Sequence, residues 1–239
     1  MLVRCGDGRM YLCKYNPGTG RSYSLARELT GSRFAGVWGL CDMDLAFVNI
    51  RPQDLPASSL PAVSFNNCLG RQWDDDVMDV NNTSSGIASR SNAEFLLKVV
   101  LFDIWLANED RIINNTNLLY DCSTRRFKAI DHAGIFNQSF SPPLQLLELE
   151  DTLLYSDLFT DACKSLAADS AWLSSLKDTF SDNLDKCRQV APLIWKSIPE
   201  SWKIDCDVFD EMMSFLFSPD WTEPVWDQFN TIIIKASAL

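Results

Sequence analysis

The chain has 239 residues, of which 46% are hydrophobic and 22% charged, as in a globular protein with a substantial core. Its 21 basic and 32 acidic residues give a net charge of −11, which argues against nucleic acid bound on a general basic surface. No stretch approaches the ~18 consecutive apolar residues that a membrane span needs, and the N-terminus MLVRCGDGRM is too polar for a signal peptide. We therefore expect a cytoplasmic protein that binds neither a membrane nor, by itself, nucleic acid.

The cysteines and the histidine do not favour a metal site of the zinc type. The 8 cysteines form no C-x-x-C pair, and the chain contains 1 histidine. We predict reduced thiols that are mostly buried, as expected in a reducing compartment.

The first segment of the chain predicts a β-hairpin. Leu2–Cys5 and Met10–Tyr15 flank Asp7-Gly8, a two-residue turn signal. A helix is then expected to start near Ser22 or Ser24, both favourable N-cap residues. It runs towards a series of glycines that predicts its end, namely Gly31, Gly36 and Gly39.

A strand and an irregular region follow. Asp44–Ile50 predicts the strand, and prolines at positions 52, 56 and 61 keep the next residues irregular. We therefore place a boundary between two units near residues 51–65, which divides the chain into residues 1–62 and 63–239. Residues 66–90 are polar, contain the acidic run Asp74–Asp76, and predict a surface loop.

The best-defined predicted helix covers Ser91–Ala107. Ser91 and Glu94 match a capping box, in which each side chain satisfies the backbone N–H of the other residue. Apolar residues at helical spacing then give one broad face. We expect a buried helix whose end leads directly to Asp110.

Three polar residues beyond this helix have the identity and spacing that phosphoryl transfer requires. Asp110 is followed five residues later by Asn115, the spacing of the protein-kinase catalytic loop. A predicted hairpin of 117–120 and 126–130 then brings Asp131 back beside Asn115. In such a site one carboxylate orients and deprotonates the acceptor hydroxyl, while the Asn and the second carboxylate hold metal ions on the phosphates. Asn117 lies on the same polar run, so the choice of coordinating Asn stays open.

For three neighbouring residues the pattern gives less specific roles than for Asp110, Asn115 and Asp131. Arg111 is expected either to contact a phosphate or to form a structural salt bridge. His132 stands where the kinase D-F-G motif has Phe, and we expect it to pack or to bond to the loop, with a metal-ligand or base role as the alternative. Asp103 lies near the apolar face and is expected to anchor the loop rather than to act in chemistry.

The rest of the chain predicts helices. Apolar residues recur at helical spacing over 144–154, 155–168, 171–190, 191–198, 206–217 and 225–236. The tryptophans of this region are expected to pack in the core. They are Trp172, Trp195, Trp202, Trp221 and Trp226.

The central motif resembles that of a known family. N-E-D-R-I-I-N-N-T-N-L-L followed by A-I-D-H-A-G resembles the HipA-like kinases and, more distantly, the phosphoinositide kinases. The resemblance implies an α+β, two-lobed protein-kinase-like fold with a small β-rich N-terminal lobe and a mostly helical C-terminal lobe. It also implies ATP and Mg²⁺ as cofactors, Asp110 as the catalytic base, and Asn115 and Asp131 as metal ligands.

The same resemblance assigns roles in the N-terminal lobe. Lys14 would contact the α- and β-phosphates, and Glu28 would pair with it. Adenine would lie against backbone groups around Val48 and Ile50. Little of the chain precedes Lys14, so either the Gly6–Gly8 turn covers the phosphates or a partner chain completes the lobe.

The resemblance implies that the protein phosphorylates Ser or Thr hydroxyls of a protein substrate, as the toxin of a toxin–antitoxin pair with a cognate antitoxin. One alternative is a small-molecule or lipid kinase, and another is a pseudokinase or antitoxin-like binding module. Lys14, Asp110, Asn115 and Asp131 are all present, and an inactive module would not need them. We therefore favour an enzyme.

Overall fold

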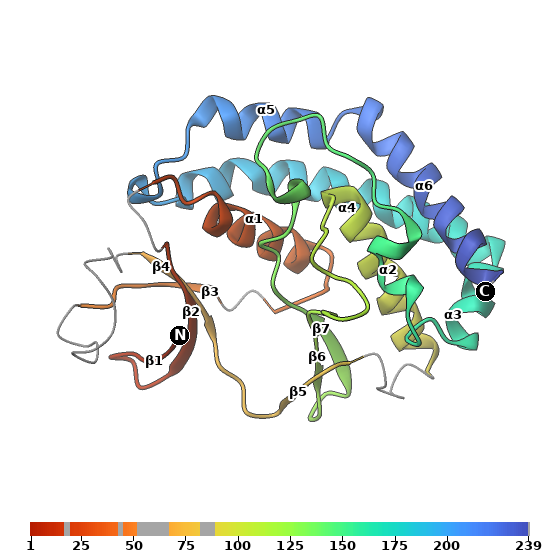
Figure 1. Cartoon of the computed structure of the whole chain (residues 1–239), viewed down its shortest axis with the longest axis horizontal. Coiled ribbons are helices and arrows are strands. Elements are labelled where there is room, and N and C mark those ends of the chain that lie inside the picture. The colour runs from red at the N-terminus through yellow and green to blue at the C-terminus, as the bar shows by residue number, and fades with distance from the viewer. Residues whose placement is uncertain (17–19, 43–44, 52–66, 82–88, 239) are drawn as a thin grey trace.

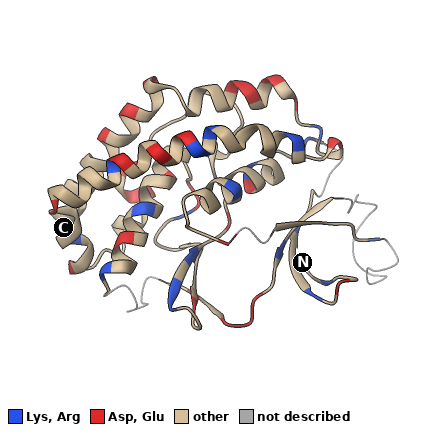
Figure 2. Ribbon diagram, turned by 180° about the vertical axis from the view of Figure 1, so that it is seen from behind, with Lys and Arg blue, Asp and Glu red and all other residues tan. Residues whose placement is uncertain are grey.

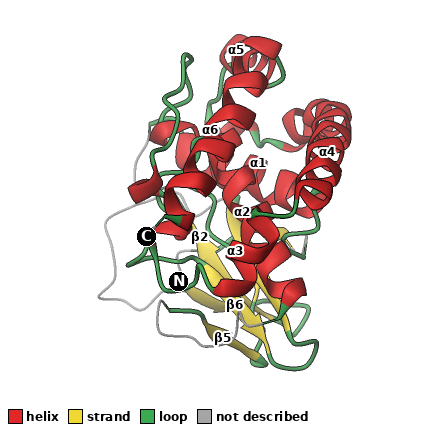
Figure 3. Cartoon of the chain, turned by 90° about the vertical axis from the view of Figure 1, so that its right-hand side faces the viewer, coloured by secondary structure: helices red, strands yellow, loops and turns green. Residues whose placement is uncertain are grey.

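The protein has a mixed α+β fold. The computed structural model describes residues 1–16, 20–42, 45–51, 67–81 and 89–238, and within them it contains two small antiparallel sheets and six α-helices (Figure 1). The helices gather on one side of the molecule and both sheets on the other (Figure 3). The α+β class predicted from the sequence is confirmed.

The first sheet is formed by the N-terminal hairpin and two later strands. Strands β1 (Leu2–Arg4) and β2 (Met10–Lys14) pair through a turn in which Gly8 has a φ of 82°, a backbone conformation that suits glycine. The hairpin prediction is confirmed. Strand β4 (Cys68–Gln72) lies between β2 and β3 (Leu45–Val48), which gives the order β1-β2-β4-β3.

Helix α1 (Tyr23–Val37) follows the hairpin and packs against the helical side of the molecule. The prediction that Gly31 helps to end the helix is wrong, because the helix continues past it and the chain turns at Gly39, where φ is 69°. Packing, rather than helix termination, explains the glycine at position 31. A Cβ atom at Gly31 would lie 2.4 Å from Cβ of His132, so only glycine allows this close approach.

The second sheet is β5 (Val77–Asp79), β6 (Leu118–Asp121) and β7 (Arg126–Ala129), in that order. The predicted hairpin of β6 and β7 is confirmed. The prediction that residues 66–90 form only a surface loop is wrong, because β4 and β5 lie within them, while residues 82–88 lie outside the described part. Residues 73–76, which we call the linking segment, connect the two sheets (Figure 1).

Helix α2 (Arg90–Leu106) is the central buried helix, and every side chain from Val99 to Leu106 is buried. Its cap differs from the prediction. Ser89 Oγ accepts a hydrogen bond from the backbone N–H of Asn92 at 3.2 Å, whereas Glu94 pairs with Arg90 at 3.1 Å. The helix begins two residues earlier than the Ser91 capping box predicts, because Ser89 supplies the side-chain acceptor for the free N–H groups.

Four further helices complete the chain, namely α3 (Asp161–Ala167), α4 (Ser170–Ser197), α5 (Cys206–Leu216) and α6 (Pro219–Ser237). The two helices predicted over 171–190 and 191–198 are one helix, α4. It continues through Pro192 because its buried stripe of Cys187, Ala191 and Ile194 keeps helical spacing across the proline.

Two predictions for the C-terminal part have different outcomes. Residues 144–154 do not form the predicted α-helix. They contain 3-10 turns, at Leu149–Asp151 and, starting within the range, Leu153–Tyr155. The predicted core position of the tryptophans is confirmed, since Trp202 and Trp221 are buried and the other three pack against the core.

The predicted division after residue 62 falls at a position outside the described residues. Described elements that precede this position contact described elements that follow it. Strand β4 pairs with β2 and β3, while α1 packs against α4, where the rings of Trp38 and Phe180 lie 5.8 Å apart. The division stays a prediction.

The cysteines and the helices bear on two exclusions. All 8 cysteines lie in the described part and are free, and four of them are buried. Among the helices that the structure describes, none is long and apolar enough to cross a membrane.

Candidate active site

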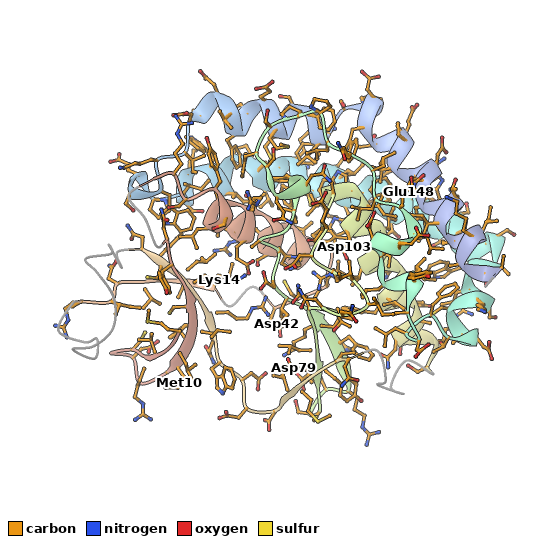
Figure 4. The ribbon with its side chains drawn as sticks, in the orientation of Figure 1. Met10, Lys14, Asp42, Asp79, Asp103 and Glu148 are labelled. Carbon is orange, nitrogen blue, oxygen red and sulfur yellow. The ribbon has the colours of Figure 1, made fainter. Side chains whose placement is uncertain are left out.

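Lys14 joins three segments of the chain and lies at the end of β2 (Figure 4). Its Nζ lies 3.0 Å from Oε2 of Glu28 on α1 and 2.5 Å from Oδ1 of Asp131, which follows β7. Asp131 has a φ of 54°, so the chain turns sharply after the strand. The predicted Lys14–Glu28 pair is therefore present in the structure, and Asp131 shares the same lysine.

Electrostatics keep this group ionised. Burial lowers the pKa of Lys14, but Glu28 and Asp131 outweigh it and raise the pKa above its usual value. Burial raises the pKa of Asp131, but the Lys14 cation outweighs this effect and the net shift is downward. Asp131 is consequently a carboxylate at neutral pH, as a metal ligand must be.

Asp110 is held by the two asparagines that follow it. Asn115 Nδ2 donates to Oδ1 and to the backbone oxygen of Asp110, both at 3.0 Å. Asn117 Nδ2 donates to Oδ2 at 3.3 Å and to the same backbone oxygen at 3.2 Å. Both side chains of the predicted Asn pair therefore contact Asp110, and the choice of coordinating Asn stays open.

Gly134 brings the loops of Asp110 and Asp131 together. A Cβ atom at Gly134 would lie 2.4 Å from Cβ of Asp110 and 2.8 Å from Oδ1 of Asn108. The backbone oxygen of Gly134 also accepts a hydrogen bond from the backbone N–H of Glu109 at 3.4 Å. Only glycine permits this approach, so Gly134 sets the separation of the two carboxylate loops.

Arg111 forms a buried network beneath Asp110. Its Nε lies 2.9 Å from Oδ2 of Asp103 on α2, and both side chains are almost fully buried. Its Nη1 donates to the backbone oxygens of Thr116, at 3.3 Å, and Asn117. Asn108 Nδ2 donates to the other oxygen of Asp103 at 2.8 Å. Of the two predicted roles for Arg111, the structure supports the salt bridge, and Asp103 anchors the loop as expected.

The comparisons with known proteins can now be set beside this geometry. The sequence matches the family model described as HipA-like kinase over residues 1–225. The chain belongs to the HipA-like kinase family. A comparison with curated proteins finds no match. This HipA-like kinase is therefore a kinase-type phosphotransferase, and the family implies the use of ATP and a divalent metal ion in general.

A cavity in this HipA-like kinase lies between its two sheets and has a volume of ≈ 780 Å³. Apolar side chains of both sheets line it, namely Leu12 on β2 and Leu119 on β6, together with Ile130. The linking segment and Asp42 and Asp79 border it (Figure 4). Leu12 lies two residues before Lys14 on the same face of β2, and Ile130 directly precedes Asp131, so two of the segments that carry the ion pairs also border the cavity.

Val48 and Ile50, at which contacts with the nucleotide were predicted, do not line this cavity. Both side chains are buried in a second small core with Tyr11, Cys13 and Cys68. The prediction placed the connection between the units after β3, in residues that mostly lie outside the described part. In the structure the sheets are instead connected after β4, by the linking segment.

Lys128 lines the cavity between the sheets. No motif in the sequence had indicated a role for it. Its Nζ lies 2.8 Å from Oδ2 of Asp42, 2.9 Å from Oδ2 of Asp121 and 3.5 Å from Oδ2 of Asp74. Burial lowers the pKa of Lys128, but Asp42 and Asp121 outweigh it and raise the pKa. The lysine thus ties the linking segment to the hairpin of β6 and β7.

The donor set of the HipA-like kinase fits a hard divalent cation. Asp131 Oδ1 contacts Lys14 and the N–H of Ala133, while Oδ2 has no hydrogen bond within the described residues. The side-chain oxygen of Asn115 likewise has no hydrogen bond within the described residues. The described residues include no cluster of three or more His, Cys, Asp and Glu side chains that could hold a metal ion. Mg²⁺ takes one or two carboxylates from a protein and completes its shell with phosphates and water.

His132 packs as the sequence predicts. It is fully buried, its backbone N–H donates to Oε2 of Glu28 at 2.7 Å, and its ring meets that of Phe102 edge-on. Nη2 of Arg111 lies 3.3 Å from Nδ1. Because arginine only donates, Nδ1 accepts and Nε2 carries the proton. Nε2 is buried and has no hydrogen-bond partner among the described residues.

We predict that the imidazole of His132 stays neutral in the folded protein at pH values at which an exposed histidine is protonated. Burial, followed by the positive charge of Arg111, lowers its pKa well below 6.5. Below pH 6.5 the unfolded chain binds a proton that the folded chain refuses, so this residue contributes stability above pH 6.5 that is lost as the pH falls. Nitrogen-15 chemical shifts of the ring measure its state, and no assignment is needed because the chain has 1 histidine. Titration near pH 6.5 in the folded state would contradict the prediction.

Proposed function

We propose that this HipA-like kinase transfers the γ-phosphoryl group of ATP, with Mg²⁺, to a Ser or Thr hydroxyl of a protein. The observation that carries the proposal is the convergence of Lys14, Glu28 and Asp131, with Asp131 117 residues beyond Lys14, on a loop that approaches Asp110 and its two asparagines. A structural ion pair alone would not require a second carboxylate held by amides on an adjoining loop. Phosphoryl transfer requires both.

The nucleotide is assigned to the cavity between the sheets. The base lies between Leu12 and Leu119, where apolar side chains from both sheets line the cavity, as is usual for cofactor pockets. The phosphates then extend towards Lys14 and Asp131. The contacts at backbone groups of Val48 and Ile50 stay a prediction.

Each site residue has one role in the reaction. Asp110 orients the acceptor hydroxyl and accepts its proton as the bond from the hydroxyl oxygen to the γ-phosphorus forms and the bond to the β–γ bridging oxygen breaks, which releases ADP. Asp131 and Asn115 would hold Mg²⁺, which when bound would neutralise charge on the phosphates. Lys14 contacts the α- and β-phosphates, and Glu28 positions its ammonium group.

The biological setting is proposed from the family resemblance. We infer a toxin of a toxin–antitoxin pair, with a protein substrate and a cognate antitoxin as partners, in the cytoplasm. A partner chain that completes the small lobe stays a prediction. An anionic lipid acceptor is disfavoured because acidic residues are distributed over the outer helices and the linking segment (Figure 2), and such a surface repels anionic membranes.

The proposal is tested by transfer of label from γ-labelled ATP to proteins of a lysate. We expect labelling with Mg²⁺ that is lost on chelation. Lys14→Met should raise the KM for ATP by about tenfold to a hundredfold, since a charge-assisted contact to phosphate contributes roughly 1.5–3 kcal/mol. The matched control is Lys186→Met on the exposed side of α4, which should leave KM unchanged.

Other outcomes would point to the alternatives. Labelling of a small molecule or lipid instead of protein would replace the acceptor class. Binding of ATP without transfer to any acceptor would favour a pseudokinase, and a folded chain that binds no nucleotide would overturn the kinase assignment.

A further inference from the structure

Three cavities of this protein adjoin one another in a row. The cavity between the sheets, here cavity 1, shares Asp79 and Ile130 with cavity 2, which has a volume of ≈ 390 Å³. Cavity 2 shares Ile113 with cavity 3, of ≈ 450 Å³. The lining residues therefore run from the proposed nucleotide site, by way of the segment that follows Asp110, to the turns that precede α3.

We propose that cavities 2 and 3 bind an extended polypeptide segment of the acceptor protein, with a bulky apolar side chain of that segment in cavity 3. The inference rests on the proposed function and deepens it, because it names the form of the substrate and a determinant of specificity.

The lining of cavity 2 suits a polypeptide backbone. Six of its ten lining residues are polar, namely Asp79, Asn81, Asn114, Asn115, Thr116 and Asn117. Asn115 and Asn117 donate to Asp110, which leaves the amide of Asn114 to donate to and accept from the alternating N–H and C=O groups of an extended chain. Among the described residues that line cavity 2 there is no lysine or arginine, the side chains that would bind a phosphorylated small-molecule acceptor.

The lining of cavity 3 suits an apolar side chain. Leu154 and Phe159 are buried at 2% and 9% exposure and form its floor. Tyr155 is 45% exposed, which is unusual for a large side chain and leaves its ring available to a ligand. Asp157 and Lys164 carry opposite charges at the border, so cavity 3 selects for shape and apolar area rather than for charge.

The spacing between the catalytic residue and cavity 3 fits a short stretch of chain. Ile113, which lines cavity 3, lies three residues after Asp110, so their Cα atoms are at most about 10 Å apart. An extended acceptor covers the same distance in about three residues. The apolar side chain is therefore expected two to four residues from the acceptor Ser or Thr, on one side of it.

The test uses a positional-scanning library of peptides with one fixed Ser or Thr, labelled from γ-labelled ATP by the full chain. We expect leucine and aromatic residues to be preferred over aspartate by about tenfold or more at one position two to four residues from the acceptor, as burial of such a side chain implies. Tyr155→Asp should abolish this preference, and Tyr155→Phe should keep it.

The matched control is Leu193→Asp. Leu193 is 61% exposed on α4 and does not line the three cavities, so the same new charge there should leave the preference intact. In all variants the KM for ATP should be unchanged, which shows that the chain is folded.

The outcomes separate this inference from the function on which it rests. ATP hydrolysis without labelling of any peptide, a wild type without positional preference, or an unchanged preference in Tyr155→Asp would each overturn the inference alone. Absence of any ATP turnover would overturn the proposed function and the inference with it.

Discussion

Replacing Asp131 with Asn should reduce kcat by more than about 10³-fold, because a metal ion on the phosphates contributes several kcal/mol to the transition state. The amide keeps the size of the side chain but removes the charge that Lys14 pairs with at 2.5 Å. Steady-state transfer from γ-labelled ATP at increasing Mg²⁺ measures the effect. Part of the loss should be recovered at high Mg²⁺, since a weakened metal site can still be filled.

Asp110→Asn should give a loss of a different kind. General-base and orienting residues contribute about 10²–10⁴-fold, so kcat should fall within this range while the Mg²⁺ requirement and the KM for ATP stay unchanged. Asp182→Asn, at an exposed position of α4, is the matched control and should have no effect. If Asp110→Asn altered the Mg²⁺ requirement as strongly as Asp131→Asn, the division of roles between the two carboxylates would be wrong.

The site motif could be predicted from the sequence because its geometry is mostly local. Asp110 and Asn115 lie on one turn, and the hairpin of β6 and β7 returns the chain to Asp131. The Lys14–Glu28 pair spans 14 residues and needs only a strand followed by a helix. Short-range patterns of this type leave few alternative arrangements.

The cavity between the sheets could not be placed in the same way, because strand β4 gives no apolar alternation. Its sequence is C-L-G-R-Q, and it is held by pairing with β2 and β3. Gly70 lies at its centre, where a Cβ atom would be 2.9 Å from Cγ2 of Val48. A central glycine lowers the strand signal, although here it is required by packing. This strand and the linking segment after it therefore had no clear signal in the sequence.

For the buried network of Arg111, the salt bridge was one of two predicted alternatives. The sequence left phosphate contact and salt bridge open, since a residue adjoining a catalytic Asp is compatible with both. One signal favours the salt bridge, which is the position of Asp103 on the apolar face of a buried helix. A carboxylate there must find a partner, because an unpaired buried charge is very costly.

Arg111→Met should lower the free energy of unfolding by about 3–5 kcal/mol, the cost of leaving the other member of a buried ion pair without its partner. Asp103 is 3% exposed and would retain only the hydrogen bond from Asn108. The backbone oxygens of Thr116 and Asn117 would also lose their donor. Chemical denaturation at pH 7 measures the loss, and Arg188→Met, which affects an exposed pair with Asp185, is the control with less than about 1 kcal/mol.

The pH dependence of this variant distinguishes an unpaired charge from a simple loss of packing. Burial already raises the pKa of Asp103 to about 6 in the folded chain, against the opposing effect of Arg111. A folded pKa above the unfolded value near 3.8 means that the protonated carboxyl favours the folded state at low pH, and that this contribution is lost as the pH rises through the folded pKa. Without Arg111 the pKa should rise further, so the destabilisation of Arg111→Met should shrink between pH 7 and pH 5. The double variant Arg111→Met with Asp103→Leu should be more stable than Arg111→Met at pH 7, because it removes the unpaired carboxylate. Equal destabilisation at both pH values, with no recovery in the double variant, would show that the arginine acts through its volume and not through its charge.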